Sequence, residues 1–252
     1  MSSVDRYLHV SGEGPPVVVL HGGPGFNHAY LVPHLQRLAV GRSLVFFDQH
    51  DGDSNELNPG VSAEMIFCKA GEVLDRFASA DRLRVIAHSW GTIVLLGALR
   101  QRPHLRLSGL LISPVPTNRD RFDQMRINLL SRFGPELAQG LATFEDGKLQ
   151  GPTIEPFLSH YVSRQETRLP GLSFDISVYR QVLESLGSFN FSAALPQISN
   201  CHILHGADDF TTLDLISDLV SNCASMTLMP ETGHFPFAEQ PEDFIERAQR
   251  LL

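Results

Sequence analysis

The sequence predicts an α/β fold, in which helices cover both faces of a mostly parallel sheet and a helical insertion interrupts the core. Short apolar runs alternate with longer amphipathic segments along most of the 252 residues. These runs are apolar throughout, which is typical of strands that are buried on both faces of a sheet. The alternation stops after Ser113 and resumes near Cys201. A single core divided by an insertion accounts for this pattern.

The first part of the chain begins with a strand, a helix and a second strand. Residues 17–20 form an apolar run between a Pro–Pro pair and a glycine-rich segment, and therefore predict a buried strand. Residues 27–40 have the apolar spacing of a helix, despite Pro33 within them. Residues 43–47 are apolar again and predict the next strand.

Four further elements complete this part of the core. Residues 62–80 carry apolar side chains at helical spacing. The pattern then predicts a strand over residues 83–87, a helix over residues 90–100 and a strand over residues 107–113.

The insertion is predicted to be helical. Residues 117–195 contain several helical stretches rich in Phe and Tyr, and no clear strand. An insertion at the carboxyl ends of parallel strands lies over the place where open α/β sheets bind ligands. We therefore expect an α/β core of residues 1–114 and 197–252, with residues 115–196 forming a helical lid, or cap.

The strand–helix alternation returns with an apolar run at residues 201–205. Residues 211–220 predict a helix, because Thr211 begins a T-x-x-D capping pattern. Residues 224–229 predict the last strand. The final helix is expected to begin at Pro241, since proline suits the first turn of a helix.

Composition and charge exclude several classes of protein. The formal net charge of −8 disfavours nucleic acids and anionic membranes as partners. No signal-peptide pattern is evident, and the apolar runs are too short to span a bilayer. The three cysteines are odd in number and lack metal-ligand spacing, so we expect reduced thiols and no metal site. These features predict a soluble, cytoplasmic protein.

Ser89 lies at a predicted sharp turn between a strand and a helix, in the sequence A-H-S-W-G. This matches the G-x-S-x-G pattern except at Ala87, and such a turn lifts the serine Oγ above the edge of the sheet. An ordinary serine at a helix N-terminus is the alternative. The strand and helix on either side favour Ser89 as a nucleophile.

The glycine-rich loop at residues 21–25 (H-G-G-P-G) directly follows the first strand. Its glycines allow the backbone to pass close to a ligand, and it does not match a phosphate-binding pattern. We expect the backbone N–H groups of Gly23 and Trp90 to form an oxyanion hole. His21 is expected to order the loop by hydrogen bonding. A plain tight turn is the alternative.

His234 is the candidate base, because it follows the last predicted strand in a turn that contains glycine. An acid is needed to orient this histidine and to stabilise its protonated form. Asp208 and Asp209 both follow the strand at 201–205, so both are candidates. A solvated turn before a helix is the alternative role for either aspartate.

Together these segments resemble the α/β-hydrolase superfamily, and within it the proline iminopeptidase-like branch. The similar motifs are HGGPG at 21–25, FDQ at 47–49, HSWG at 88–91, HGADD at 205–209 and GHFPFAEQPEDF at 233–244. The resemblance implies the α/β-hydrolase fold with the chain order Ser, Asp, His. It also selects Asp209, because the acid of that branch falls three residues after the glycine. The implied catalytic triad is Ser89, Asp209 and His234.

Three features differ from this branch. The FDQ segment continues with His50 and an acidic stretch where Arg-Gly is usual, and Ala87 replaces the first glycine of the nucleophile turn. The insertion contains no Trp, and none of its carboxylates lies in a motif of the peptidases. The acidic segment at 48–56 could attract an amine, although a solvated loop is the simpler interpretation. The fold and the triad are therefore implied more strongly than aminopeptidase activity.

The expected protein is a serine hydrolase that cleaves an ester, thioester or amide bond through an acyl-enzyme on Ser89, without a metal or organic cofactor. Its aromatic insertion suggests a small, partly apolar molecule or short peptide as substrate. Gly22, Phe26 and Phe235 are expected to contribute to substrate binding. A proline iminopeptidase-like aminopeptidase, a C–C bond hydrolase and a non-catalytic ligand-binding protein are alternatives. The oligomeric state is left open.

Overall fold

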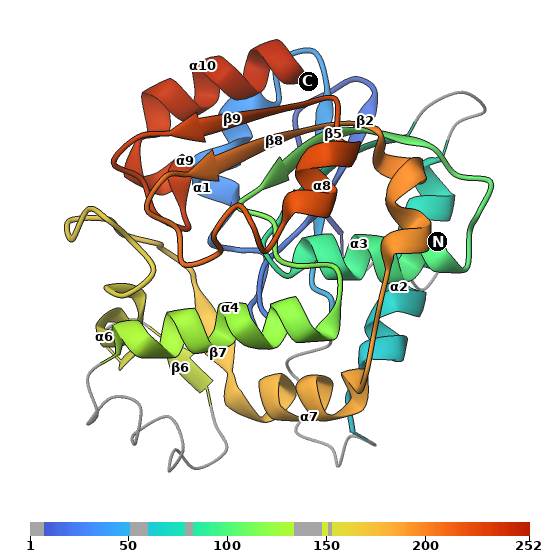
Figure 1. Cartoon of the computed structure of the whole chain (residues 1–252). Helices are drawn as coiled ribbons and strands as arrows, with labels where there is room; N and C mark the ends of the chain where they lie inside the picture. The colour runs from blue at the N-terminus through green and yellow to red at the C-terminus, as the bar shows by residue number, and fades with distance from the viewer. Residues whose placement is uncertain (1–7, 51–59, 79–82, 134–147, 151–152) are drawn as a thin grey trace.

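The computed structural model describes residues 8–50, 60–78, 83–133, 148–150 and 153–252 (Figure 1). Within them, seven strands form one sheet in the order β1-β3-β2-β4-β5-β8-β9, parallel except where β1 pairs with β3. The strands are β1 (Leu8–Ser11), β2 (Pro16–Leu20), β3 (Ser43–Phe47), β4 (Leu83–His88), β5 (Leu107–Ile112), β8 (Asn200–Gly206) and β9 (Ser225–Met229). The predicted mostly parallel α/β architecture is confirmed.

The six predicted strands are all present, each within one residue of its expected bounds. The antiparallel edge strand β1 was not predicted. It is only four residues long, and Val10 within it is exposed. β1 is held in the sheet by its pairing with β3, in which Leu8 lies opposite Phe47. It has no buried apolar run of its own that would predict a strand.

Three predicted helices are confirmed: α2 (Ala63–Phe77), α3 (Gly91–Arg100) and α10 (Pro241–Leu251). The Ser62 hydroxyl caps α2 by accepting a hydrogen bond from the N–H of Met65 at 3.2 Å. The last two residues of the helix predicted over 62–80 lie outside the described residues.

The helix predicted over residues 27–40 is wrong in its first part. Helical structure is confined to α1 (Val32–Leu35) and the short 3-10 helix η2 (Gln36–Leu38). The N–H of His28 instead donates to the Asp48 carboxylate at 2.7 Å. This long-range contact ties the chain before α1 to the end of β3.

The helix predicted over residues 211–220 is also displaced, since α8 spans Ser217–Asn222. Thr211 does not cap a helix. It is fully buried, and its N–H donates to the Asp209 carboxylate at 2.9 Å. A local contact with a residue two positions earlier has therefore replaced the expected helix cap.

The core lies on both faces of the sheet, because successive residues of each buried strand point to opposite sides. Val18 and Leu20 pack in the cluster that contains α2 and α3. Val17 and Val19 pack in the cluster that contains α1 and α10. Figure 1 shows α10 and the pair α2 and α3 on opposite sides of the sheet. Predicted coverage of both faces is thus confirmed.

The chain between β5 and β8 is mainly helical but also contains a hairpin. Its described elements are α4 (Arg119–Arg132), β6 (Lys148–Gln150), α6 (Glu155–Leu158), β7 (Ser173–Asp175), α7 (Ile176–Leu186) and the 3-10 helix η4 (Ser192–Ile198). The prediction of no clear strand is wrong, because two three-residue strands pair across a long separation and leave no periodic pattern. The division into a core and a lid stays a prediction.

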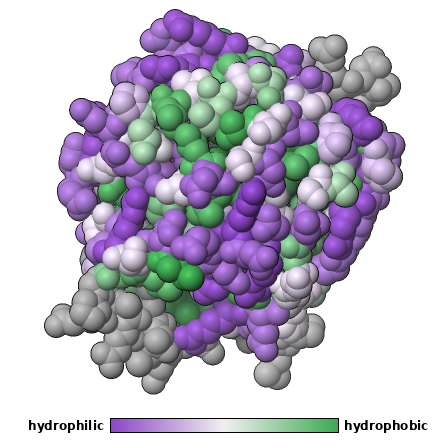
Figure 2. All heavy atoms as spheres, in the orientation of Figure 1, coloured by the Kyte–Doolittle hydropathy of each residue, from purple (hydrophilic) through white to green (hydrophobic). Residues whose placement is uncertain are grey.

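The surface is of mixed polarity. Hydrophilic residues cover most of the face shown in Figure 2, and hydrophobic residues form smaller areas between them. In the part of the chain that the structure describes, no helix has the length and apolar character needed to cross a membrane. All three cysteines, Cys68, Cys201 and Cys223, are free.

Candidate active site

The topology of the sheet brings two loops together at the ends of β2 and β4. These strands are adjacent and parallel, so their carboxyl ends lie at the same edge. The chain leaves β2 towards α1 on one face and leaves β4 towards α3 on the other. Open α/β sheets bind ligands at such a switch point. The loop at 21–25 and Ser89 both lie there.

Ser89 occupies a sharp turn that its neighbours enforce. Its φ of 53° is unusual for a residue with a side chain. At Gly91, a Cβ would lie 2.5 Å from the carbonyl oxygen of Leu20, so the strand and α3 can approach only with glycine there. Ala87 is fully buried in β4, which accommodates its extra methyl group. The turn therefore holds Ser89 at the start of α3.

Three predicted residues form a continuous chain of hydrogen bonds. The Ser89 Oγ lies 2.8 Å from Nε2 of His234. Nδ1 of His234 lies 2.8 Å and 3.0 Å from the two carboxylate oxygens of Asp209. Because the carboxylate can only accept, Nδ1 carries the proton and Nε2 is free to accept from the serine hydroxyl. This is the geometry of a nucleophile, a general base and an orienting acid.

Asp209, rather than Asp208, faces the histidine. Burial alone would raise the pKa of Asp209, but attraction to His234 and His205 and hydrogen bonds from His234 and Thr211 lower it to about 2. Asp209 therefore stays ionised at neutral pH. The side chain of Asp208 points elsewhere and accepts a hydrogen bond from the Ser163 hydroxyl at 3.0 Å.

The glycine-rich loop is held in place by the FDQ segment. The Gln49 side chain donates to the carbonyl of His21 at 2.7 Å, and the Gln49 N–H donates to Nε2 of His21 at 3.1 Å. Burial lowers the pKa of His21 to about 4, so this ring is neutral and orders the loop, as expected. Gly23 has a φ of 139°, and an added Cβ would lie 3.0 Å from the N–H nitrogen of Gly25. The loop thus depends on glycine at this position.

A buried relay links this loop to the histidine loop. The N–H of Gly22 donates to the Tyr30 oxygen at 2.8 Å, and the Tyr30 hydroxyl donates to Nδ1 of His88 at 2.7 Å. Nε2 of His88 in turn donates to the carbonyl of His234 at 3.0 Å. Burial, and then the nearby His234, lower the pKa of His88 to about 3, so its ring stays neutral. Neither Tyr30 nor His88 was recognised from the sequence, because only their packing reveals the relay.

Glu239 is a second residue that the sequence did not single out. Its buried carboxylate accepts from the N–H groups of Gly233 at 3.0 Å and Phe235 at 3.1 Å, on either side of His234. It also accepts from the N–H of Ser163 at 2.8 Å. Glu239 lies within the segment similar to the family's histidine motif, which was its only signal. One carboxylate therefore fixes the histidine loop against the segment between β5 and β8.

We expect Glu239→Gln to loosen the histidine loop, because an amide NH₂ would face backbone N–H groups in place of an acceptor. Leaving such buried groups unpaired costs about 1–3 kcal/mol. Misplacement of a catalytic group can lower kcat by about a hundredfold. Urea unfolding and ester hydrolysis measure the two effects. The matched control is Glu13→Gln, in the exposed turn between β1 and β2, which should change neither. Normal stability and kcat in Glu239→Gln would contradict this role.

A cavity of about 320 Å³ lies between the glycine-rich loop and the segment that follows β5. Gly23 and Phe26 line it, together with residues from α4, α6 and α7. Tyr161 also lines it, and the Tyr161 carbonyl accepts a hydrogen bond from the His234 N–H at 2.7 Å. The cavity therefore adjoins both the glycine-rich loop and the segment bonded to the His234 loop, although Ser89 and His234 do not themselves line it.

Two of the three residues expected to bind substrate do not reach this cavity. Phe235 is fully buried in the core, where its ring packs against Tyr30 and Phe237. Its ring also packs edge-on against that of His234, with 5.5 Å between the ring centroids. Gly22 lies against Tyr30 and His88, and a Cβ there would be 2.9 Å from the Tyr30 oxygen. Phe26 alone of the three lines the cavity, and its part in substrate binding stays a prediction.

The acidic segment at 48–56 offers no described site for a cation. Asp48 accepts a hydrogen bond from Nδ1 of His28 at 2.8 Å. The other acidic residues of this segment lie outside the described residues. Among the residues placed by the structure, no cluster of three His, Cys, Asp or Glu side chains could hold a metal ion.

The chain is similar to known proteins in both sequence and structure. Residues 17–247 match the alpha/beta hydrolase family. A proline iminopeptidase of Heyndrickxia coagulans is 23% identical over 261 residues, which cover 93% of this chain and 89% of that protein. A solved proline iminopeptidase-related protein from Thermus thermophilus is 24% identical, with a TM-score of 0.73 over 97% of this chain and 92% of that one. A thermophilic esterase from Thermogutta terrifontis is 16% identical, with a TM-score of 0.64 over 96% and 91%. These structures share the fold.

Proposed function

Since the chain belongs to the alpha/beta hydrolase family, we propose that it is a serine hydrolase that cleaves an ester, thioester or amide bond of a small, partly apolar substrate. The family match and the proline iminopeptidase relative confirm the resemblance that the sequence motifs indicated. One observation carries the proposal: the Ser89 Oγ lies 2.8 Å from Nε2 of His234, whose Nδ1 lies 2.8 Å from Asp209.

The reaction begins when the Ser89 oxygen attacks the carbonyl carbon of the substrate and its proton passes to Nε2 of His234. The tetrahedral intermediate collapses as the bond to the leaving group breaks, and His234 returns the proton to that group. A water molecule then attacks the acyl-enzyme and gives a proton to His234. The free acid leaves, and Ser89 recovers its proton. Asp209 stabilises the protonated histidine in both steps.

The negative charge that develops on the carbonyl oxygen needs hydrogen-bond donors. We assign this role to the backbone N–H groups of Gly23 and Trp90. Trp90 is the N-cap residue of α3, where the helix dipole favours negative charge. Gly23 lines the cavity from the loop after β2. Each such donor typically lowers the barrier by about 2.7–4 kcal/mol.

Aminopeptidase activity is the second candidate, because the relatives include proline iminopeptidases. Binding a free amino terminus requires a carboxylate or several carbonyl oxygens at the substrate site. None of the described residues that line the cavity is Asp or Glu. We therefore favour hydrolysis of a substrate that lacks a free amine.

A fluorophosphonate probe and two substrate panels test this function. We expect the wild-type protein to be labelled and to hydrolyse p-nitrophenyl esters with higher kcat/KM than aminoacyl p-nitroanilides. A preference for proline p-nitroanilide would favour the aminopeptidase. Folded protein that is neither labelled nor active would contradict the hydrolase and favour a non-catalytic binding protein.

A further inference from the structure

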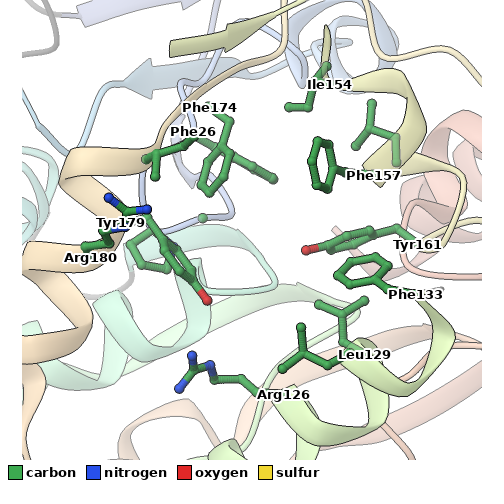
Figure 3. A pocket seen from close by; sticks show the side chains of 15 residues that line it. Phe26, Arg126, Leu129, Phe133, Ile154, Phe157, Tyr161, Phe174, Tyr179 and Arg180 are labelled. Atoms are coloured by element: carbon green, nitrogen blue, oxygen red, sulfur yellow. The ribbon is translucent and has the colours of Figure 1, made fainter. Parts of the chain in front are cut away.

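The cavity next to the glycine-rich loop has a largely apolar wall with few polar side chains. Those in its described lining belong to Tyr161, Tyr179, Arg126 and Arg180. The two arginines already interact with other residues, and they lie on different sides of Tyr179 (Figure 3). Neither tyrosine hydroxyl has a hydrogen-bond partner among the residues that the structure describes. The tyrosine hydroxyls therefore keep hydrogen-bonding capacity for a ligand.

Tyr161 links this cavity to His234. Its backbone carbonyl accepts a hydrogen bond from the His234 N–H at 2.7 Å, and its ring packs edge-on against the His234 ring, with 5.8 Å between the centroids. A second edge-on contact, with 5.2 Å between the centroids, holds the same ring against Phe210. Figure 3 shows the Tyr161 oxygen at the end of the ring that faces the middle of the cavity. A firmly packed ring thus presents its hydroxyl to the cavity.

The surroundings of Tyr161 favour an uncharged partner for this hydroxyl. Burial, and then the nearby Tyr179, raise the pKa of Tyr161 above its usual range, so the phenol is protonated at neutral pH and can donate. Figure 3 shows Phe133 and Phe157 on the same side of the cavity as Tyr161. A carboxylate or an ammonium group placed there would lose its hydration at a large cost. An uncharged carbonyl oxygen loses much less, and one donor compensates it.

Resting on the proposed serine hydrolase function, we propose that the acyl chain of the substrate carries a second, uncharged carbonyl group, and that the Tyr161 hydroxyl donates a hydrogen bond to it. The acyl chain reaches this cavity because Gly23, to which we assign the acyl oxygen, lines it. The apolar part of the chain packs against residues such as Leu129 and Phe133. A site built to hydrogen-bond a substrate group discriminates against an analogue that lacks it, since the site's own polar group is then left unpaired.

Matched pairs of esters test the proposal. The p-nitrophenyl esters of 5-oxohexanoate and 5-methylhexanoate have acyl chains of the same length and shape, but only the first has a second carbonyl. The esters of 4-oxohexanoate and 4-methylhexanoate test another distance from the cleaved bond. In at least one pair we expect wild-type kcat/KM to be about fivefold higher for the oxo ester, as for one uncharged hydrogen bond. Apolar burial alone would favour the methyl esters.

Tyr161→Phe removes only the hydroxyl oxygen, and we expect the oxo ester to lose its advantage of about fivefold. The readout is the ratio of kcat/KM within a pair, in which a general effect of the substitution cancels. Ser131→Ala is the matched control, because it removes an exposed hydroxyl on α4 that lies outside the cavity lining. A wild-type preference for both methyl esters, or an oxo preference that survives Tyr161→Phe or is lost only in Tyr179→Phe, would overturn the proposal while leaving the hydrolase function intact.

A binding measurement separates the two ideas if no ester is hydrolysed. Benzylacetone and isopentylbenzene have the same shape, but only benzylacetone has a carbonyl. Ligand-observed NMR compares their affinities for Ser89→Ala, whose binding does not depend on turnover. Tighter binding of benzylacetone that is lost when Tyr161→Phe is added would support the carbonyl site even if the hydrolase function were wrong. Equal binding of the two ligands, or tighter binding of isopentylbenzene, would reject the carbonyl site.

Discussion

Ser89→Ala is expected to lower kcat for ester hydrolysis by about a million-fold, as loss of the nucleophile does in other serine hydrolases. The substitution removes the Oγ that lies 2.8 Å from Nε2 of His234, so no acyl-enzyme can form. Labelling by a fluorophosphonate probe should disappear with the activity. Hydrolysis of a p-nitrophenyl ester and gel fluorescence of the labelled protein measure the two effects.

The fold should survive this change, because only one oxygen atom is lost. The unfolding midpoint of Ser89→Ala should stay close to that of the wild type. Ser221→Ala, which removes an exposed hydroxyl on α8, is the matched control and should retain full labelling. Persistent labelling or activity in Ser89→Ala would place the nucleophile elsewhere.

Asp209→Asn is expected to lower kcat by about ten thousand-fold, the loss seen when the orienting acid of such a triad becomes an amide. Both oxygens of Asp209 face Nδ1 of His234, so the carboxylate selects the tautomer that leaves Nε2 free to take the serine proton. An amide would present a donor to the same atom and favour the wrong tautomer. Steady-state kinetics with a p-nitrophenyl ester measures the loss.

Asp208→Asn is the matched control, since the neighbouring carboxylate is exposed and bonds the Ser163 hydroxyl. We expect its kcat to stay within a few-fold of the wild type. A larger loss in Asp208→Asn than in Asp209→Asn would reverse the assignment of the acid.

The stability that the Asp209 carboxylate contributes to the fold is expected to depend on pH. The folded-state pKa of Asp209 is about 2, below the value of about 3.9 for an unfolded aspartate. A lowered pKa contributes stability that is fully present above the unfolded value and is lost as pH falls through the folded value. The stability difference between wild type and Asp209→Asn should therefore shrink from about pH 4 towards pH 2. Urea unfolding of the wild type and Asp209→Asn across this pH range measures the difference.

The strands that carry the site were predictable because they are buried on both faces. Runs such as residues 17–20 and 44–47 are apolar throughout, and a buried parallel strand needs that composition wherever it lies. The turn at Ser89 was predictable for a related reason. Its pattern of small residues around Ser89 is local, although the carbonyl of Leu20 that requires Gly91 lies on the neighbouring strand β2.

The elements that were missed or misplaced depend on partners that are distant in sequence. The pairing of β6 with β7 joins segments too short to show a period of their own. His28 was expected to lie in the first turn of a helix, but its N–H binds Asp48, 20 residues later. Local helix signals cannot anticipate a tertiary acceptor that satisfies the same N–H group.

By itself, the sequence determined the order of the six buried strands and of helices α2, α3 and α10, the sharp turn at Ser89 and the glycine-rich loop, because each follows from local periodicity or from a short glycine-containing motif. Local pattern left Asp208 and Asp209 open, and the family motif selected between them. Only the tertiary structure decided which carboxylate faces His234, that Glu239 holds the histidine loop, and that arginines line the cavity. The physical reason is separation along the chain. Ser89 and His234 are 145 residues apart, and their 2.8 Å contact exists only after the sheet has formed.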